Sequence, residues 1–367
     1  MTEEELSEAI AGATGPLRIL GGGTRPIGRP VDGALLSTAA LSGIVDYEPG
    51  ALTLVAKAGT PVAEIETALA AEGQRLPFEP MDHRGLLGTQ GTPTIGGIVA
   101  ANVSGPRRIQ VGACRDFLLG VRFVDGRGRV LKNGGRVMKN VTGYDLVKLM
   151  AGSRGTLGVL SEVSLKVLPR PAETATLRFT GLNEESAIKA VTAALGSPFE
   201  VTGAAHMQGA TLLRLEGFGE SVRYRARALQ DLLASFGKAE VLPDEIETWQ
   251  ALRDVAPYHS RTGDVWLYSV TPTEAPALAG QLRGHGALDV IFDWGGGRLW
   301  VLAPEGQDMR QTNLRGHATL IRASKETRRR LPVFQPEPVP IQKISQDLRA
   351  KFDPRGILNP GLMEHIP

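Results

Sequence analysis

Short apolar runs separated by turn residues dominate residues 17–168, and this pattern predicts a β-rich region. Thr60–Glu72 (TPVAEIETALAAE) instead has the spacing of a helix, with Thr60 as N-cap, Pro61 at the first helical position and Gly73 as terminator. Residues 75–112 are expected to form a long glycine-rich loop, and residues 140–150 a short helix. The expected strands are 17–20, 34–37, 44–47, 52–56, 117–124, 130–131 and 159–168.

After Pro169-Arg-Pro171 the pattern changes to strands alternating with helices, which predicts a ferredoxin-like α+β layer. The expected strands are 176–180, 200–207, 212–216, 238–242, 265–270, 288–293 and 299–302, with helices at 184–195, 220–236 and 273–283. A proline-rich linker (331–340) and a last helix (341–352) follow. We therefore expect a glycine-rich domain (1–171), an α+β domain (172–333) and a C-terminal linker, helix and NPG tail (334–367) that packs back on the first domain. No internal sequence repeat stands out.

Composition is ordinary for a soluble globular protein: 42% of the 367 residues are hydrophobic and 22% are charged. The net charge of +2 gives no general attraction to nucleic acid. The arginines 328–330 are expected at a solvated helix end. The acidic start MTEEELSEAI shows no secretory signal, and no window approaches the roughly 18 apolar residues of a membrane span. We expect a cytoplasmic protein, with peripheral contact at the inner membrane face through a partner left open.

The cysteine and histidine content limits which cofactors this chain can hold by itself. One cysteine, Cys114, is present, whereas an iron–sulfur cluster needs about four thiolates. The six histidines are far apart in sequence and show no metal-site spacing, so no metal is expected. Any redox cofactor of this chain is therefore expected to be organic.

A glycine loop, GGGTRPIG (Gly21–Gly28), follows the first expected strand. A dinucleotide fingerprint would open a helix here, but Pro26 and Pro30 bracket a loop, and no Gly-Lys-Ser/Thr of a phosphate-binding P-loop follows. Consecutive glycine amides can form a nest for an anion, because glycine reaches positive φ and lets a ligand approach the backbone. The alternative is a tight surface loop between strands.

Further glycine-rich segments follow. TIGGIVAANVSG within residues 91–106 can run along a flat ligand, or it can be a buried turn. The segments GACRD (112–116), KNVTGYDL (139–146) and GSRGTLGV (152–159) each carry little information alone.

The order and spacing of these segments together resemble the FAD-binding (PCMH-type) domain of the vanillyl-alcohol oxidase family. The closing KISQDLRAKFDPRGILNPG is similar to the C-terminal signature of its hydroxy-acid oxidase branch. The match covers about residues 17–171 and 341–361. Within that branch, the length, KNVTGYDL and the short middle domain are most similar to the smaller FAD-binding subunits of bacterial glycolate oxidases. The resemblance implies an α+β fold: a PCMH-type domain of two α/β subdomains and a ferredoxin-like cap.

The resemblance also implies which residues hold FAD. The first glycine loop would hold the pyrophosphate, the TIGG segment would run along the pyrophosphate, ribityl chain and flavin, and Pro80 and Met81 would pass the isoalloxazine. No histidine stands in the first loop, so non-covalent FAD is expected. The implied cofactor-binding residues are Gly21, Gly22, Gly23, Thr24, Arg25, Pro26, Gly28, Pro80, Met81, Thr94, Ile95, Gly96, Gly97, Asn102, Gly105, Gly112 and Val159.

The pattern departs from the family where catalysis is expected. Oxidation of a 2-hydroxy acid needs a base for the hydroxyl proton and a cation for the carboxylate. Relatives supply the base and metal ligands from a segment resembling H-x-G-D-G-N-x-H, whereas Phe292–Trp300 (FDWGGGRLW) has no histidine. The catalytic residues are therefore unknown. Either the chain relays electrons for a larger homologous subunit, or Arg298 with Tyr144, Tyr258 or His259 forms a different substrate pocket. Trp294 and Trp300 are expected to pack within the sheet.

Three hypotheses follow. The first is an FAD-binding subunit of a glycolate oxidase complex, which oxidises glycolate to glyoxylate with a larger FAD-binding subunit and an iron–sulfur subunit as partners. The second is a self-sufficient FAD-dependent alcohol or 2-hydroxy-acid dehydrogenase of the same fold. The third is a non-catalytic scaffold that has lost FAD.

Overall fold

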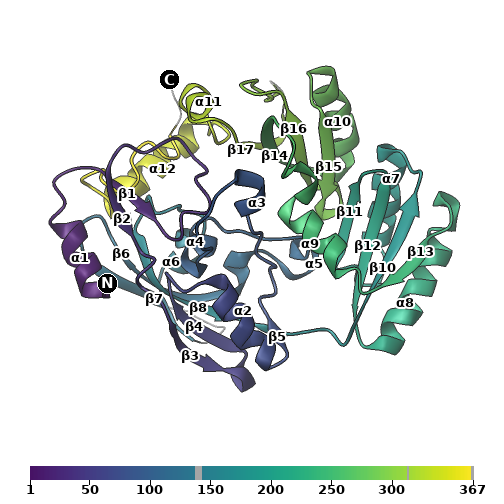
Figure 1. Ribbon diagram of the computed structural model, residues 1–367, viewed down its shortest axis with the longest axis horizontal. Helices are drawn as coiled ribbons and strands as arrows, with labels where there is room; N and C mark the ends of the chain where they lie inside the picture. Colours follow the sequence, from purple (N-terminus) through teal and green to yellow (C-terminus); the bar gives the residue numbers. More distant parts are fainter. Residues whose placement is uncertain (137–142, 312–313, 365–367) are drawn as a thin grey trace.

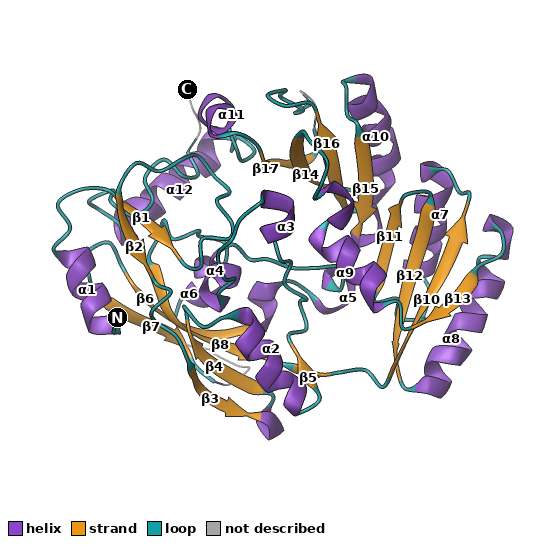
Figure 2. Cartoon of the chain, viewed as in Figure 1, coloured by secondary structure: helices purple, strands orange, loops and turns teal. Residues whose placement is uncertain are grey.

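The computed structural model describes residues 1–136, 143–311 and 314–364, and within them the strands form four sheets (Figure 1). The largest two lie side by side, one built from the first half of the chain and one from the second (Figure 2). A continuous hydrophobic core joins them, running from Leu54 in the first sheet to Trp300 in the second. The two large sheets therefore share one hydrophobic core.

The first large sheet is antiparallel and has the order β3-β4-β8-β6-β7. Its strands are β3 (Ile44–Glu48), β4 (Thr53–Lys57), β8 (Val159–Lys166), β6 (Leu118–Val124) and β7 (Val130–Gly134). Three helices belong to the same half of the chain as this sheet: α1 (Glu3–Ala11), α2 (Val62–Ala71) and α6 (Leu146–Met150). The N-terminal helix α1, which was not predicted from the sequence, begins with a capping box made by Thr2 and Glu5.

Two smaller pairs of strands complete this half. β1 (Leu17–Leu20) and β2 (Ala34–Ser37) pair in parallel, and β5 (Gln74–Arg75) pairs with β9 (Leu168–Pro169). The C-terminal tail returns here, because Leu358 forms a parallel bridge with Leu17. The expected return of the tail to the first domain is confirmed.

Two local predictions were wrong. Pro61, not Thr60, occupies the N-cap of α2, and the Thr60 hydroxyl instead donates to the Lys57 carbonyl at 2.7 Å. The glycine-rich segment 75–112 is not a continuous loop: it contains α3 (Arg84–Leu87), α4 (Ile95–Ala100) and α5 (Arg108–Val111). Glycines within α4 hid its helical pattern, although Thr94 caps it and four of its residues are buried. The start of the helix expected at 140–150 lies outside the described residues.

The second large sheet is wholly antiparallel, with the order β13-β10-β12-β11-β15-β16-β14-β17. Its strands are β10 (Glu173–Thr180), β11 (Gly203–Met207), β12 (Ala210–Gly217), β13 (Glu240–Pro243), β14 (Asp264–Val270), β15 (Asp289–Asp293), β16 (Arg298–Ala303) and β17 (Gly316–Arg322). The sheet consists of two four-stranded units with the same strand order, β13-β10-β12-β11 and β17-β14-β16-β15. The first unit has the β-α-β-β-α-β order of a ferredoxin-like fold, whereas the second has α10 between β14 and β15 but no helix among the described residues between β16 and β17. The two units join where His206 of β11 pairs with Phe292 of β15. The fold thus contains a repeat that the sequence did not reveal.

Helices α7 (Glu184–Leu195), α8 (Gly219–Leu232) and α10 (Ala275–Gly284) pack on this sheet (Figure 1). Helix α9 (Ile246–Asp254) precedes β14, and α11 (Lys325–Arg330) and α12 (Val339–Phe352) follow β17. The division of the chain into domains at residues 171 and 333 stays a prediction. In the described part of the chain, no helix is long and apolar enough to cross a membrane.

Candidate functional site

The parallel strands β1 and β2 are joined by residues 21–33, which are not helical. Parallel strands need a long connection, usually a helix, and here the glycine loop makes it. The loop presses against the segment before α4: a Cβ on Gly22 would lie 1.5 Å from the Thr92 carbonyl oxygen, and one on Gly21 would lie 2.5 Å from Thr94 Oγ1. Only glycine fits at these positions. The prediction of a loop in place of a helix is confirmed.

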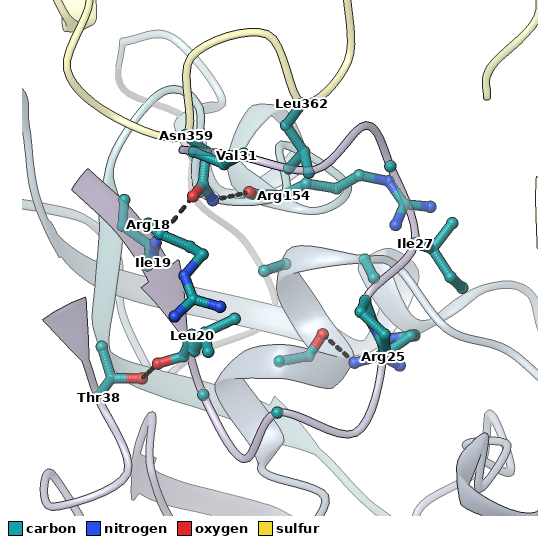
Figure 3. A pocket seen from close by; sticks show the side chains of 18 of the residues that line it. Arg18, Ile19, Leu20, Arg25, Ile27, Val31, Thr38, Arg154, Asn359 and Leu362 are labelled. Atoms are coloured by element: carbon teal, nitrogen blue, oxygen red, sulfur yellow. Dashed lines mark hydrogen bonds between the residues drawn. The ribbon is translucent and has the colours of Figure 1, made fainter. Parts of the chain in front are cut away.

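A cavity of about 460 Å³ opens beside this loop (Figure 3). The glycine loop, α4, the turn before β8, α11 and the tail all contribute to its walls. Many of the residues predicted for FAD meet here: Gly21, Gly22, Gly23, Thr24, Arg25, Pro26, Gly28, Thr94, Gly96, Gly97 and Val159. The structure thus gathers two segments that are about 70 residues apart in sequence, together with the start of β8.

Helix α4 is held against the first sheet and the loop. Gly96 packs so closely that a Cβ would lie 2.6 Å from the Ala58 side chain. The Thr94 hydroxyl accepts a hydrogen bond from the Gly97 amide at 3.4 Å, and the Gly97 carbonyl accepts one from Arg25 Nη2 at 2.6 Å. The small residues of TIGG therefore bring helix backbone, rather than side chains, to the cavity wall.

The other residues that were predicted to bind FAD do not line this cavity. Ile95 and Met81 are buried in the core, and Pro80 lines a second cavity of about 500 Å³, whose walls include residues of β5, β12 and α9. Asn102 accepts a hydrogen bond from the Arg115 amide, and the Gly105 backbone lies against Glu79. Gly112 ends α5 beside the Asp116 side chain. The assignment of all these residues to FAD stays a prediction.

Several residues that line this cavity were not predicted from the sequence. Asn359 accepts a hydrogen bond from the Ile19 amide at 2.8 Å and donates one to the Arg154 carbonyl at 2.9 Å (Figure 3). The Arg29 amide donates to the Leu362 carbonyl at 3.0 Å. Residues 328–330 form the last turn of α11 as expected, with Arg329 and Arg330 exposed. Arg328 is half-buried and donates to the carbonyls of the glycine loop. The NPG tail was the available signal for Asn359, and no local signal marked Arg328.

The cavity carries strong positive charge. Arg25 and Arg154 line it, and desolvation lowers the pKa of Arg25 to about 9 and that of Arg154 to about 10, with repulsion from Arg154 adding to the shift of Arg25. Arg18, Arg29, Lys325, Arg328 and Arg329 stand along its walls as well. One carboxylate, Asp32, lies among these lining residues. Such a cavity favours an anionic ligand.

Residues 292–300, where the family resemblance led us to look for catalytic histidines, face the first half of the chain through Trp294. Its ring lies between two guanidinium groups, 4.3 Å from that of Arg108 and 3.7 Å from that of Arg298, and its Nε1 donates to the Gly105 carbonyl at 2.9 Å. Trp294 therefore joins the two halves rather than packing within the sheet as predicted, whereas Trp300 is buried in β16.

The Arg298 guanidinium already has interaction partners within the protein. Its Nη1 donates to the Ser104 carbonyl at 3.1 Å and lies 3.8 Å from Asp293. Burial raises the pKa of Asp293 to about 6. The substrate pocket suggested for Arg298 does not form with Tyr144, whose side chain is 89% exposed, and the Tyr258 hydroxyl donates to the Trp300 carbonyl. The His259 ring pairs with the Asp254 carbonyl. Nowhere in 1–136, 143–311 and 314–364 do three potential metal ligands gather.

Residues 1–134 match the family model of the FAD binding domain. Together with the glycine loop and cavity, this match defines a flavoprotein of the PCMH type. The chain is 39% identical over 365 residues to the glycolate oxidase subunit GlcE of Escherichia coli (strain K12), covering 98% of this chain and 95% of that protein. The chain therefore belongs to the PCMH-type FAD-binding family, in the group of this glycolate oxidase subunit. FAD is its cofactor.

More distant relatives agree with this placement. The glycolate oxidase subunit GlcD of Bacillus subtilis (strain 168) is 26% identical over 280 residues, which cover 75% of this chain and 56% of that protein. A solved structure of alkyldihydroxyacetonephosphate synthase superposes with a TM-score of 0.69 at 18% identity and covers 97% of this chain and 74% of that one. This likeness confirms the expected fold class.

Proposed function

We propose that this chain is the smaller FAD-binding subunit of a glycolate oxidase complex that converts glycolate to glyoxylate. Its likeness to GlcE along nearly the whole chain is the observation that carries the proposal. The expected partners are a larger homologous FAD subunit and an iron–sulfur subunit, since Cys114 alone cannot hold a cluster. The complex is expected in the cytoplasm, with membrane contact made through a partner.

The residues around the first cavity fit non-covalent FAD. The glycine loop offers closely approachable backbone, and Gly96 and Gly97 add the backbone of α4. The half-buried guanidinium groups of Arg25 and Arg154 line the cavity and supply positive charge for the pyrophosphate. Bound FAD supplies a two-electron acceptor. The chain's own residues hold and orient the cofactor and screen it from water.

We assign this subunit to electron relay rather than to glycolate oxidation. A substrate carboxylate needs a free cation, but Trp294, Asp293 and the Ser104 carbonyl already surround the Arg298 guanidinium. The segment 292–300 also offers no histidine to remove the hydroxyl proton. Substrate oxidation is therefore placed on the larger subunit.

One observation favours the second candidate, a self-sufficient dehydrogenase. His83 is buried, and burial together with the positive charges of Arg25, Arg298 and Arg154 lowers its pKa well below the usual value. Its Nδ1 lies 3.3 Å from the Met81 carbonyl, which favours donation from Nδ1 and leaves Nε2 as a proton acceptor. At neutral pH this imidazole is uncharged and can accept a proton, and its lowered pKa makes it a weaker base than an ordinary histidine.

Anaerobic glycolate titration separates the candidates. The purified chain should be yellow, should release intact FAD on denaturation, and should keep its oxidised flavin spectrum when glycolate is added. Bleaching should require the larger subunit. Bleaching of the isolated chain that disappears in His83→Gln would refute the relay and establish the second candidate. Protein that is colourless and free of flavin would refute both candidate functions and would leave the third hypothesis, a non-catalytic scaffold.

A further inference from the structure

Arg154 was not among the residues expected to bind FAD, yet it shares the first cavity with Arg25. Figure 3 shows both side chains at the same end of the cavity, beside Ile27, whereas Arg18 lies across from them. Arg154 reaches this end from the turn before β8, and Arg25 reaches it from the glycine loop. Two cations from separate segments therefore meet around one space.

Among the described residues, neither guanidinium has an acidic partner. In the part of the chain that the structure describes, no carboxylate lies within ion-pair distance of Arg25 or Arg154. Arg25 donates to the Gly97 carbonyl, and the Arg154 guanidinium packs on the Phe334 ring at 4.7 Å. Both side chains are half-buried, and partly desolvated cations without counter-charge cost free energy, which a bound anion reduces. Desolvation lowers the pKa of both side chains, which agrees with the lack of a counter-charge.

The backbone at Arg154 is held from two sides. Arg154 has a left-handed φ of 52°, its amide donates to the Ala100 carbonyl at 2.8 Å, and its carbonyl accepts from Asn359 Nδ2 at 2.9 Å. Asn359 is itself buried and accepts from the Ile19 amide. A residue in a strained conformation keeps it only when its surroundings enforce it. The end of α4 and the C-terminal tail together provide that enforcement.

We propose that Arg154 is the second cation of the diphosphate site, and that Asn359 is its positioning residue. Arg25 and Arg154 then balance the two negative charges of the FAD diphosphate, and the C-terminal tail sets the affinity for the phosphorylated cofactor. The inference rests on the proposed flavin site and adds a ligand-binding role for Arg154 and a positioning role for the tail.

The test compares binding of FAD and of riboflavin, which has no phosphate, by flavin fluorescence at low and high salt. Arg154→Gln should raise the FAD dissociation constant about tenfold and flatten its salt dependence, because one charge contact is lost. Arg154→Lys should keep most of the affinity and the salt dependence. Arg227→Gln is the matched control, since Arg227 is exposed on α8 and lines neither cavity. Riboflavin binding should not change.

Asn359→Ala should also weaken FAD, and the double variant Asn359→Ala/Arg154→Gln should be no weaker than Arg154→Gln alone, because both changes act on one contact. Thermal unfolding of the FAD-free proteins reports whether each variant folds. FAD affinity of Arg154→Gln within twofold of wild type, an equal loss for Arg227→Gln, or additive losses in the double variant would overturn the inference. Failure of the partner-dependent glycolate reaction in a chain that shows these FAD effects would instead refute the proposed function.

Discussion

Arg328 Nη1 donates a hydrogen bond to the Gly28 carbonyl at 3.1 Å and a second one to the Pro26 carbonyl. A helix that follows the second large sheet thereby holds the glycine loop that begins the first cavity. The loop has no helix of its own to fix its path, so distant side chains take over that task. Cofactor retention should accordingly depend on residues about 300 positions away from the loop.

Replacement of Arg328 tests this dependence. Arg328→Ala should lower the free energy of unfolding by about 1–2 kcal/mol and raise the FAD dissociation constant, because two loop carbonyls lose their donor. Arg329→Ala is the matched control, since Arg329 is more exposed and lies 3.8 Å from the exposed Asp32. Urea unfolding and FAD fluorescence measure both effects. Equal behaviour of the two variants would show that Arg328 does not hold the loop.

Close packing of the glycine loop makes a second prediction. Gly22→Ala should destabilise the protein by about 3 kcal/mol or more and abolish tight FAD binding, because the new Cβ would meet the Thr92 carbonyl. Gly15→Ala is the control, since nothing lies within 4 Å of a Cβ at that position. Thermal unfolding with and without FAD measures the difference. A Gly22→Ala protein as stable and as yellow as wild type would contradict the observed contact.

The cap of α4 can be tested with an isosteric change. Thr94→Val removes the acceptor of the Gly97 amide and should cost about 1 kcal/mol of stability, with weaker FAD binding because α4 forms part of the cavity wall. Thr94→Ser keeps the hydroxyl and should behave like wild type in FAD affinity. Denaturant titration and flavin fluorescence report the two effects. Loss of affinity in both variants would assign the effect to the methyl group instead.

Asp293 predicts a pH dependence of stability. Burial raises its pKa from 3.8 to about 6, so between these values the folded protein holds a proton that the unfolded chain has released. The stability contribution of this carboxyl is therefore greatest at acid pH and is lost as pH rises to about 6. Relative to Asp293→Asn, the free energy of unfolding of wild type should fall by about 2 kcal/mol between about pH 4.5 and 7. Parallel pH profiles for the two proteins would exclude this raised pKa.

Much of the local structure followed from local patterns. The strands β1 and β2 were predicted with their observed bounds, because short apolar runs end at glycine or turn residues there. Pro26 and Pro30 correctly predicted a loop rather than a helix. The short helix α4 was missed, because Gly96 and Gly97 weaken helical propensity and its stability comes from burial against Ala58.

The sequence by itself determined a glycine loop, an FAD-type order of segments and a ferredoxin-like second half, since these depend on residues near one another in the chain. Only the tertiary structure decided that Arg154 joins Arg25, that Asn359 and Arg328 hold the walls of the cavity, and that Trp294 joins the two halves. These contacts join residues separated by up to several hundred positions. Local sequence patterns carry no information about such pairings, because packing of the whole chain brings the partners together.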